Sequence, residues 1–315
     1  MLGGVFTFFL CLFYFVKHPT LPSKQHPLVF YSNQTSDDLK ILFKEIIHKA
    51  KTSLFLQIYG CTDPHLIHEI KMASNRGVAV TLLYDPSASG PLKKILPFAI
   101  PLACQGLMHK KILIADNELV FIGSANFTTT SLRMHDNLVV GLYQQELASF
   151  ILSSTKNHFE FKIEGQFAEF WHLPDFQNEC LLKIINSIEN AQNSIHLALF
   201  TFTHPQIIQA LIAAKKRGVE VSIAIDFYSS QGASKKAVAE LRKEGMPPLI
   251  SQKGKLLHYK WALIDQDTLF LGSANWTKSA FCKNEDCIFS LQNLTENQKN
   301  YFNSLWTEIK KNSLQ

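Results

Sequence analysis

The sequence contains little charge, few cysteines and a single long apolar run. Of the 315 residues, 18% are charged and six are cysteine. So few cysteines cannot build a disulfide scaffold for a chain of this length, and their spacings match no zinc-binding pattern. Apolar residues form a long run only over residues 2–16, which excludes a polytopic membrane protein. The hydrophobic fraction of 46% is that of a folded protein, which excludes a wholly disordered chain.

The formal net charge of +5 is mild. It permits an anionic partner, either a nucleic acid or a lipid surface, without choosing between them. The length sets a second bound, because a chain of this size corresponds to about two domains at ~150 residues each.

The apolar run at the amino terminus predicts a short membrane anchor. As a helix, residues 2–16 would span about 22 Å at ~1.5 Å per residue, which is less than the ~30 Å hydrocarbon core of a bilayer. No basic residue precedes the run and no small-x-small cleavage site follows it, although a secretory signal needs both. We therefore expect residues 1–18 to be an uncleaved segment that associates the protein with a membrane. A cleaved signal is the alternative, and the side of the membrane stays open.

Beyond a polar linker over residues 19–27, the chain repeats itself. Residues 39–86 and 182–228 each begin with an amphipathic helical pattern, continue into an apolar strand, and enter a second helix that opens with proline. An Arg-Gly-Val sequence ends that helix at residues 76–78 and again 141 positions later, at residues 217–219. A further strand closes each unit. Helices that alternate with strands predict an α/β fold with a largely parallel core sheet in each half.

The strongest signal is a motif of the form H-x-K-x4-D-x6-G-S-x-N, which occurs once in each half. Its members are His109, Lys111, Asp116, Ser124 and Asn126 in the first half, and His258, Lys260, Asp265, Ser273 and Asn275 in the second. On a strand, His and Lys two residues apart point to the same face. Two converging sets of His, Lys and Asn make a compact cationic pocket. Such a pocket suits a phosphodiester, because the transition state spreads negative charge over the non-bridging oxygens.

The doubled motif resembles the signature of the phospholipase D superfamily, and the similarity extends from about residue 28 to the end of the chain. The resemblance implies the phospholipase D fold, with two similar sheet-and-helix halves related by a pseudo-twofold axis. Here the halves would be residues 28–165 and 166–315. The resemblance also implies one active site at their junction, built from both motifs. Because both motifs lie in one chain, we expect a monomer to be active.

The motif residues predict a phosphodiesterase reaction that needs no metal ion or other cofactor. Lys111 and Lys260 would hold the non-bridging oxygens, and the motifs contain no carboxylate cluster of metal-binding type. One histidine would attack phosphorus and form a covalent phosphohistidine, while the other protonates the leaving alcohol and then activates water or an acceptor alcohol. The resemblance implies that His109 is the nucleophile and His258 the acid and base. The two copies are nearly symmetric, so the reverse assignment stays open.

Two acids that follow the motifs, and the other motif residues, have their own predicted roles. We expect an acid beyond each motif to accept the second N–H of an imidazole and fix its tautomer. Asp136 and Asp286 are the candidates, with Glu285 as an alternative to Asp286. We expect Asn126 and Asn275 to be catalytic, and we expect structural roles for Asp116, Ser124, Asp265 and Ser273.

The motif does not separate lipid from nucleic-acid substrates. The apolar amino terminus and the mild basicity favour a phospholipid at a membrane surface, with hydrolysis or transfer of phosphatidyl groups. The alternative is an endonuclease that cleaves DNA or RNA by the same mechanism, in which case binding would weaken steeply with salt. A non-enzymatic relative is a third interpretation, against which the intact motif residues in both copies argue.

Overall fold

The computed structural model describes residues 19–153, 155–175 and 178–314. The anchor expected over residues 1–18 lies outside this part. Among the helices of the described residues, none combines the length and apolar character needed to cross a bilayer. The prediction that the protein associates with a membrane is therefore not supported, because the described residues contain no helix that could span one.

The first half is built on a seven-stranded sheet with the strand order β1-β7-β6-β5-β2-β3-β4. Its elements are β1 (Leu28–Ser32), η1 (Asn33–Thr35), α1 (Leu39–Lys49), β2 (Ser53–Ile58), α2 (Pro64–Asn75), β3 (Ala79–Tyr84), α3 (Pro86–Ser89), α4 (Leu92–Ile95), β4 (Ala99–Pro101), β5 (Lys111–Ala115), β6 (Leu119–Gly123), α5 (Thr129–Arg133), β7 (Leu138–Tyr143) and α6 (Gln145–Ser153).

The second half is built on a nine-stranded sheet with the order β16-β12-β11-β10-β13-β14-β15-β9-β8. Its elements are β8 (His158–Ile163), β9 (Gln166–Leu173), α7 (Glu179–Asn190), β10 (Ser194–Leu199), α8 (Pro205–Lys216), β11 (Glu220–Ile225), α9 (Phe227–Gln231), α10 (Lys235–Lys243), β12 (Leu249–Ser251), β13 (Lys260–Ile264), β14 (Thr268–Gly272), α11 (Lys278–Cys282), β15 (Asp286–Leu291), α12 (Glu296–Lys311) and β16 (Ser313–Leu314). The predicted boundary at residues 165 and 166 falls inside the β8–β9 hairpin, which belongs wholly to this sheet.

The predicted α/β fold with two similar halves is confirmed, but the sheets are mixed rather than largely parallel. The strands β2, β3 and β4 run parallel, as do β10, β11 and β12, because a helix connects each to the next. The motif strands β5 and β13 instead pair antiparallel with β2 and β10, and each forms a hairpin with the strand that follows. The parallel prediction holds only for the repeated units that precede the motifs.

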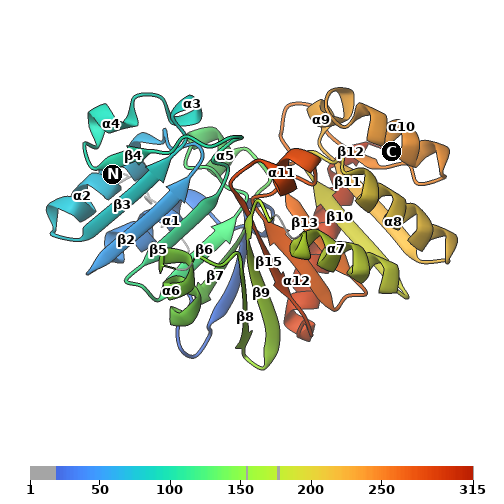
Figure 1. The fold of residues 1–315 in the computed structure, drawn as a ribbon, viewed down its shortest axis with the longest axis horizontal. Coiled ribbons are helices and arrows are strands. Elements are labelled where there is room, and N and C mark those ends of the chain that lie inside the picture. The colour runs from blue at the N-terminus through green and yellow to red at the C-terminus, as the bar shows by residue number, and fades with distance from the viewer. Residues whose placement is uncertain (1–18, 154, 176–177, 315) are drawn as a thin grey trace, which may run out of the picture.

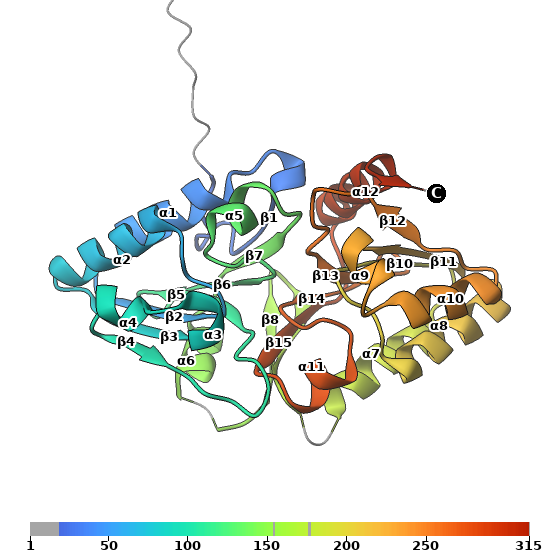
Figure 2. The ribbon, with the colours of Figure 1, turned by 90° about the horizontal axis from the view of Figure 1, so that it is seen from above.

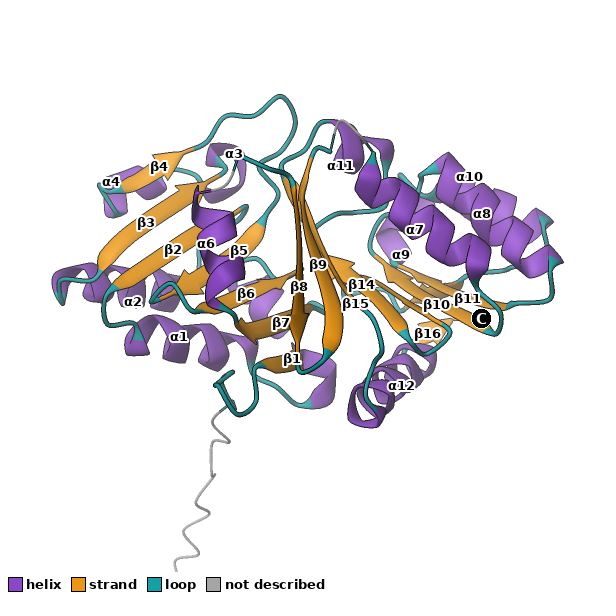
Figure 3. Cartoon of the chain, turned by 60° about the horizontal axis from the view of Figure 1, so that its bottom comes forward, coloured by secondary structure: helices purple, strands orange, loops and turns teal. Residues whose placement is uncertain are grey.

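The two sheets share a central core. Figure 1 shows them side by side, and Figure 3 shows the β8–β9 hairpin standing between them. One cluster of buried side chains joins residues of the first sheet, such as Ile112, to residues of the second, such as Trp261, through the helices α6 and α12. Separate clusters lie under α1 and α2 and under α7 and α8, on the outer faces of the sheets. The halves are therefore parts of one packed unit.

Candidate functional site

The motif strands form the floor of the site. Each begins at its motif lysine, and every residue of β5 and β13 is buried. His109 and His258 each lie two residues before a motif lysine, just ahead of the strand. Both histidines are buried, at 6% and 7% exposed. In the view from above, both motif strands approach the junction of the halves (Figure 2).

The glycine of each motif permits a close approach of two strands. A Cβ on Gly123 would lie 2.3 Å from the carbonyl oxygen of Leu138, and a Cβ on Gly272 would lie 2.2 Å from that of Cys287. These distances are shorter than real contacts allow, so glycine lets β7 and β15 pack directly on the motif loops. Asn137, just before β7, and Asp286, the first residue of β15, thereby come next to the motif serines.

His109 is held by a carboxylate from the other half of the chain. Its Nδ1 lies 2.8 Å from Oδ1 of Asp286, which is fully buried at the start of β15. Burial alone would raise the pKa of Asp286, but His109, Lys111 and the Ser273 hydroxyl outweigh it and lower that pKa. The carboxylate is therefore charged, and it fixes His109 with Nδ1 as the donor and Nε2 free to react.

His258 is held by an amide instead. Its Nδ1 lies 3.0 Å from Oδ1 of Asn137, which comes from the first half. The structure does not place Asp136 there, because the Asp136 carboxylate bonds to Gln34 and forms a 2.6 Å ion pair with Lys255. The predicted acid Asp136 is therefore not the group that orients His258, and Asn137, one residue later, takes that place. Asn137 lies 149 positions before Asp286, the same offset that separates the two histidines, so the motif spacing itself contains the signal.

Both motif lysines are buried among few counter-charges. Lys260 Nζ donates to the carbonyl oxygen of His258 at 2.7 Å, and Lys111 makes the same bond to His109. Burial lowers the pKa of Lys111 to about 7. Burial and then Lys111 lower the pKa of Lys260 well below its ordinary range. Such a site favours an anion, because a bound negative charge would stabilise both ammonium groups.

The pKa values of the two histidines are lowered as well. Burial is the largest cause in each case, and the neighbouring lysine adds to it. Asp286 opposes the shift at His109, so the pKa of His109 is lowered, whereas that of His258 is lowered far below its usual value. The third imidazole of this region, His135, lies 5.9 Å from the His258 ring.

Two aromatic rings that were not predicted from the sequence lie beside the motif histidines. Tyr59 lies 5.0 Å from the His109 ring, and Lys111 Nζ lies 5.0 Å from the centre of the tyrosine ring. Phe200 repeats both contacts with the second motif, at 5.1 Å. The two rings occupy matching places at the ends of β2 and β10, 141 positions apart, so the repeat could have identified them.

Each motif asparagine has a buried side-chain oxygen without a hydrogen-bond partner among the described residues. These atoms are Oδ1 of Asn126 and Oδ1 of Asn275. A buried amide oxygen needs a donor, so only the Nδ2 side of each amide could bind an anion. Ser124 and Ser273 have a supporting role, because their hydroxyls donate to Asn137 and Asp286 at 2.9 and 2.7 Å.

The motif aspartates lie apart from this cluster. Asp116 accepts bonds from the backbone N–H groups of residues 51–53, and Asp265 accepts them from residues 192–194. These contacts tie the far end of each motif strand to the loop that precedes β2 or β10. They are the contacts that a structural role requires.

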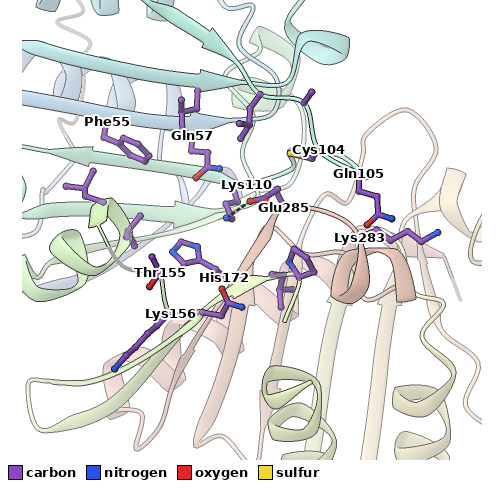
Figure 4. A pocket seen from close by; sticks show the side chains of 18 residues that line it. Phe55, Gln57, Cys104, Gln105, Lys110, Thr155, Lys156, His172, Lys283 and Glu285 are labelled. Carbon is purple, nitrogen blue, oxygen red and sulfur yellow. Dashed lines mark hydrogen bonds and ion pairs between the residues drawn. The ribbon is translucent and has the colours of Figure 1, made fainter. Parts of the chain in front are cut away.

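An ion pair joins the two halves next to His109. Lys110 Nζ lies 2.8 Å from Oε2 of Glu285, and the His109 N–H donates to the Glu285 carbonyl oxygen at 2.7 Å. Figure 4 shows this pair in the wall of a cavity of about 620 Å³ whose lining includes neither motif histidine. We call Lys110 and Glu285 the junction pair. Because Lys110 and Glu285 flank His109 and Asp286 in sequence, they hold together the two backbones that carry the His109–Asp286 contact.

Comparisons with known proteins give matches in both halves of the chain. The sequence model described as "Cardiolipin synthase, PLD-like domain" matches residues 43–159 and 184–306. The mitochondrial cardiolipin hydrolase of Xenopus laevis is 28% identical over 130 residues, which cover 40% of this chain and 60% of that protein. The phospholipase D of Rickettsia conorii is 30% identical over 118 residues, covering 35% and 59%. The chain thus spans less than two thirds of the length of these relatives.

Solved structures extend the similarity to the whole fold. The phosphatidylserine synthase of Haemophilus influenzae superposes with a TM-score of 0.69 over 95% of this chain and 89% of its own, at 13% identity. The phospholipase D family member Nuc of Salmonella typhimurium covers 47% of this chain and 95% of its own, at 29% identity and a TM-score of 0.44. The family match covers well over half of the sequence, in both halves, and the chain belongs to the phospholipase D superfamily.

Proposed function

We propose that this protein is a phosphodiesterase that cleaves phospholipids through a covalent phosphohistidine on His109. The observation that carries the proposal is the buried pair of His109 and Asp286, which leaves the His109 Nε2 free beside two lysines. The relatives named as a cardiolipin hydrolase and a phospholipase D support a lipid substrate.

In the first step, Nε2 of His109 attacks phosphorus and the bond to the leaving alcohol breaks. His258 gives its proton to the departing oxygen. Lys111 and Lys260, with the Nδ2 groups of Asn126 and Asn275 as donors, hold the non-bridging oxygens as their charge grows. In the second step, neutral His258 takes a proton from water, the hydroxyl attacks phosphorus, and the N–P bond breaks to release a phosphate monoester.

The low proton affinity of the free site fits this cycle. The site binds an anion first, and the added negative charge raises the pKa of the buried lysines and of His258. His258 is then protonated when substrate is present, which is when an acid is needed. We propose that one chain completes the cycle as a monomer, because both histidines and both lysines come from it.

The test presents lipid and nucleic acid to the same preparation. The full chain is incubated in EDTA with labelled cardiolipin, phosphatidylglycerol, phosphatidylcholine, and single- and double-stranded DNA. We expect turnover of lipid, none of DNA, and loss of turnover in His109→Asn and His258→Asn. Cleavage of DNA with no cleavage of lipid would overturn the substrate class, and EDTA inhibition that a divalent ion reverses would overturn the mechanism.

A further inference from the structure

The two halves present matching positions to the two histidines, but with different chemical groups. Ser124 donates to Asn137 as Ser273 donates to Asp286, and the N–H groups of Leu138 and Cys287 donate to those hydroxyls at 3.1 and 3.0 Å. The supporting contacts are therefore the same on both sides. What differs is that one orienting group is a neutral amide and the other a carboxylate.

The orientation of the Asn137 amide follows from its other contacts. Its Nδ2 donates to the carbonyl oxygens of Ser131 at 2.7 Å and His135 at 3.3 Å. Those acceptors require the amide nitrogen on that side, so the oxygen faces His258. His258 must then donate through Nδ1, and its Nε2 is free, as in His109. The two imidazoles are thus held in the same tautomer with different electrostatic support.

This difference matters once an imidazole becomes charged. A phosphoryl group on Nε2 leaves positive charge on the ring and its Nδ1–H. The Asp286 carboxylate stabilises that charge at His109, whereas the Asn137 amide offers only a dipole to His258. A weakly supported imidazolium releases its proton more readily, which is what protonation of a leaving group requires.

Within the described part of the chain, the other groups around His258 do not supply a carboxylate in place of Asn137. Lys260, Lys111, His109 and His135 face it, and all four disfavour its protonation. The Phe200 ring, which carries no charge, lies 5.1 Å from the His258 ring. Asp136 precedes Asn137 but turns its carboxylate to Gln34 and Lys255.

We propose that Asn137 is a positioning residue that assigns the two histidines their different roles. The amide at position 137 keeps His258 as the proton carrier, and the carboxylate at position 286 makes His109 the nucleophile. The inference rests on the proposed function, because it concerns which histidine is the nucleophile and which is the acid in the same reaction.

The test locates the covalent phosphoryl group. The full chain reacts with an aryl phosphodiester, is quenched in alkali, and is analysed by mass spectrometry of its histidine peptides. In the wild type we expect the adduct on His109 alone. Asp286→Asn gives both histidines an amide partner, so we expect labelling of His109 to slow at least tenfold and His258 to be labelled to a comparable extent. In the exchange variant N137D/D286N, we expect the adduct mainly on His258.

A second measurement separates this role from a purely structural one. In Asn137→Asp, the new carboxylate should move the ionisation that controls the acid step to higher pH, by about 1 to 3 pH units. Thermal unfolding of each variant verifies that it is folded. An Asp286→Asn protein that still labels His109 alone, or an Asn137→Asp profile that does not move, would overturn the role of Asn137. A wild type that forms no phosphohistidine would instead overturn the proposed function.

Discussion

His109 and Asp286 meet at 2.8 Å although they belong to opposite halves of the chain. The contact crosses the junction, as does that of His258 with Asn137. Neither half can therefore orient its own histidine. The junction itself completes the site, and this gives a physical reason for the two halves to share one buried core rather than fold as independent modules.

The division of roles predicts how His258→Asn behaves. With a lipid substrate, we expect turnover to fall by about 10² to 10⁴-fold, the usual contribution of a general acid and base. With an aryl phosphodiester, whose leaving group needs no proton, His109 should still be phosphorylated. The adduct should then accumulate, because no base activates water. Alkaline quenching and mass spectrometry measure it.

Two variants complete this experiment. His109→Asn should form no adduct with either substrate. His135→Asn removes the neighbouring imidazole and should keep turnover within about tenfold of the wild type. An adduct on His258 in the wild type would reverse the assignment of the two roles.

Because the motif lysines are buried, we expect that replacing one with an apolar residue stabilises the protein but lowers its activity. Lys111→Met removes a buried ammonium group, so we expect it to raise the free energy of unfolding by about 1–4 kcal/mol while reducing turnover at least 100-fold. Lys71→Met, at an exposed position of α2, is the control and should change neither. Urea unfolding and lipid turnover measure the two effects.

The pH dependence of this effect has a definite sign. Folding lowers the pKa of Lys111 to about 7, so protonation below its unfolded pKa of ~10.4 favours the unfolded chain. The contribution of Lys111 to stability should therefore rise as the pH increases from about 7 toward 10. Lys111→Met should lack this part of the rise. Equal slopes in the two proteins would contradict the burial of a titrating lysine.

The repeat and the motif predict much of this architecture because both are local patterns. The helices α2 and α8 begin at Pro64 and Pro205, as expected, and end before glycines with φ of +90° and +95°. The direction of the motif strands does not follow from these local patterns. Alternating helices and strands indicate parallel pairing, but the hairpins that follow each motif reverse it.

The orienting groups show where sequence spacing stops being informative. Counting from each motif asparagine places an acid at Asp136 or Asp286, but spacing does not show which side chain turns toward the junction. Asp136 and Glu285 occupy equivalent positions and both turn to lysines. The choice depends on packing between segments that lie more than 100 residues apart.

The junction pair predicts an effect on both stability and catalysis. Lys110 is 7% exposed and Glu285 is 34% exposed, so Lys110→Met leaves a carboxylate that reaches water. We expect a loss of about 1–2 kcal/mol, with a lower kcat and an unchanged KM, because the His109–Asp286 contact loosens. The matched control is Lys299→Met, which breaks the surface pair with Glu296 on α12 and likewise leaves a carboxylate that reaches water. A smaller change in the junction variant than in the control would contradict its role.

Replacing either motif aspartate should lower the stability of the protein without lowering its turnover. Burial raises the pKa of Asp116, but the N–H groups of Thr52, Ser53 and Lys51 outweigh it, and the pKa is lowered overall. A carboxyl whose folded pKa is depressed stabilises the protein above its unfolded pKa, and this stabilisation is lost as the pH falls through the folded value. We therefore expect Asp116→Asn to lower the free energy of unfolding at pH 7 by about 1–2 kcal/mol. Near pH 3 the difference in stability between this variant and the wild type should become smaller.

Asp265→Asn removes the equivalent contacts in the second half and should cost a similar amount of stability at pH 7. Turnover per folded molecule should stay close to the wild type in both variants, since neither carboxylate contacts a histidine or lysine of the site. A tenfold loss of turnover in a fully folded Asp116→Asn protein would show that the aspartate acts on the chemistry after all.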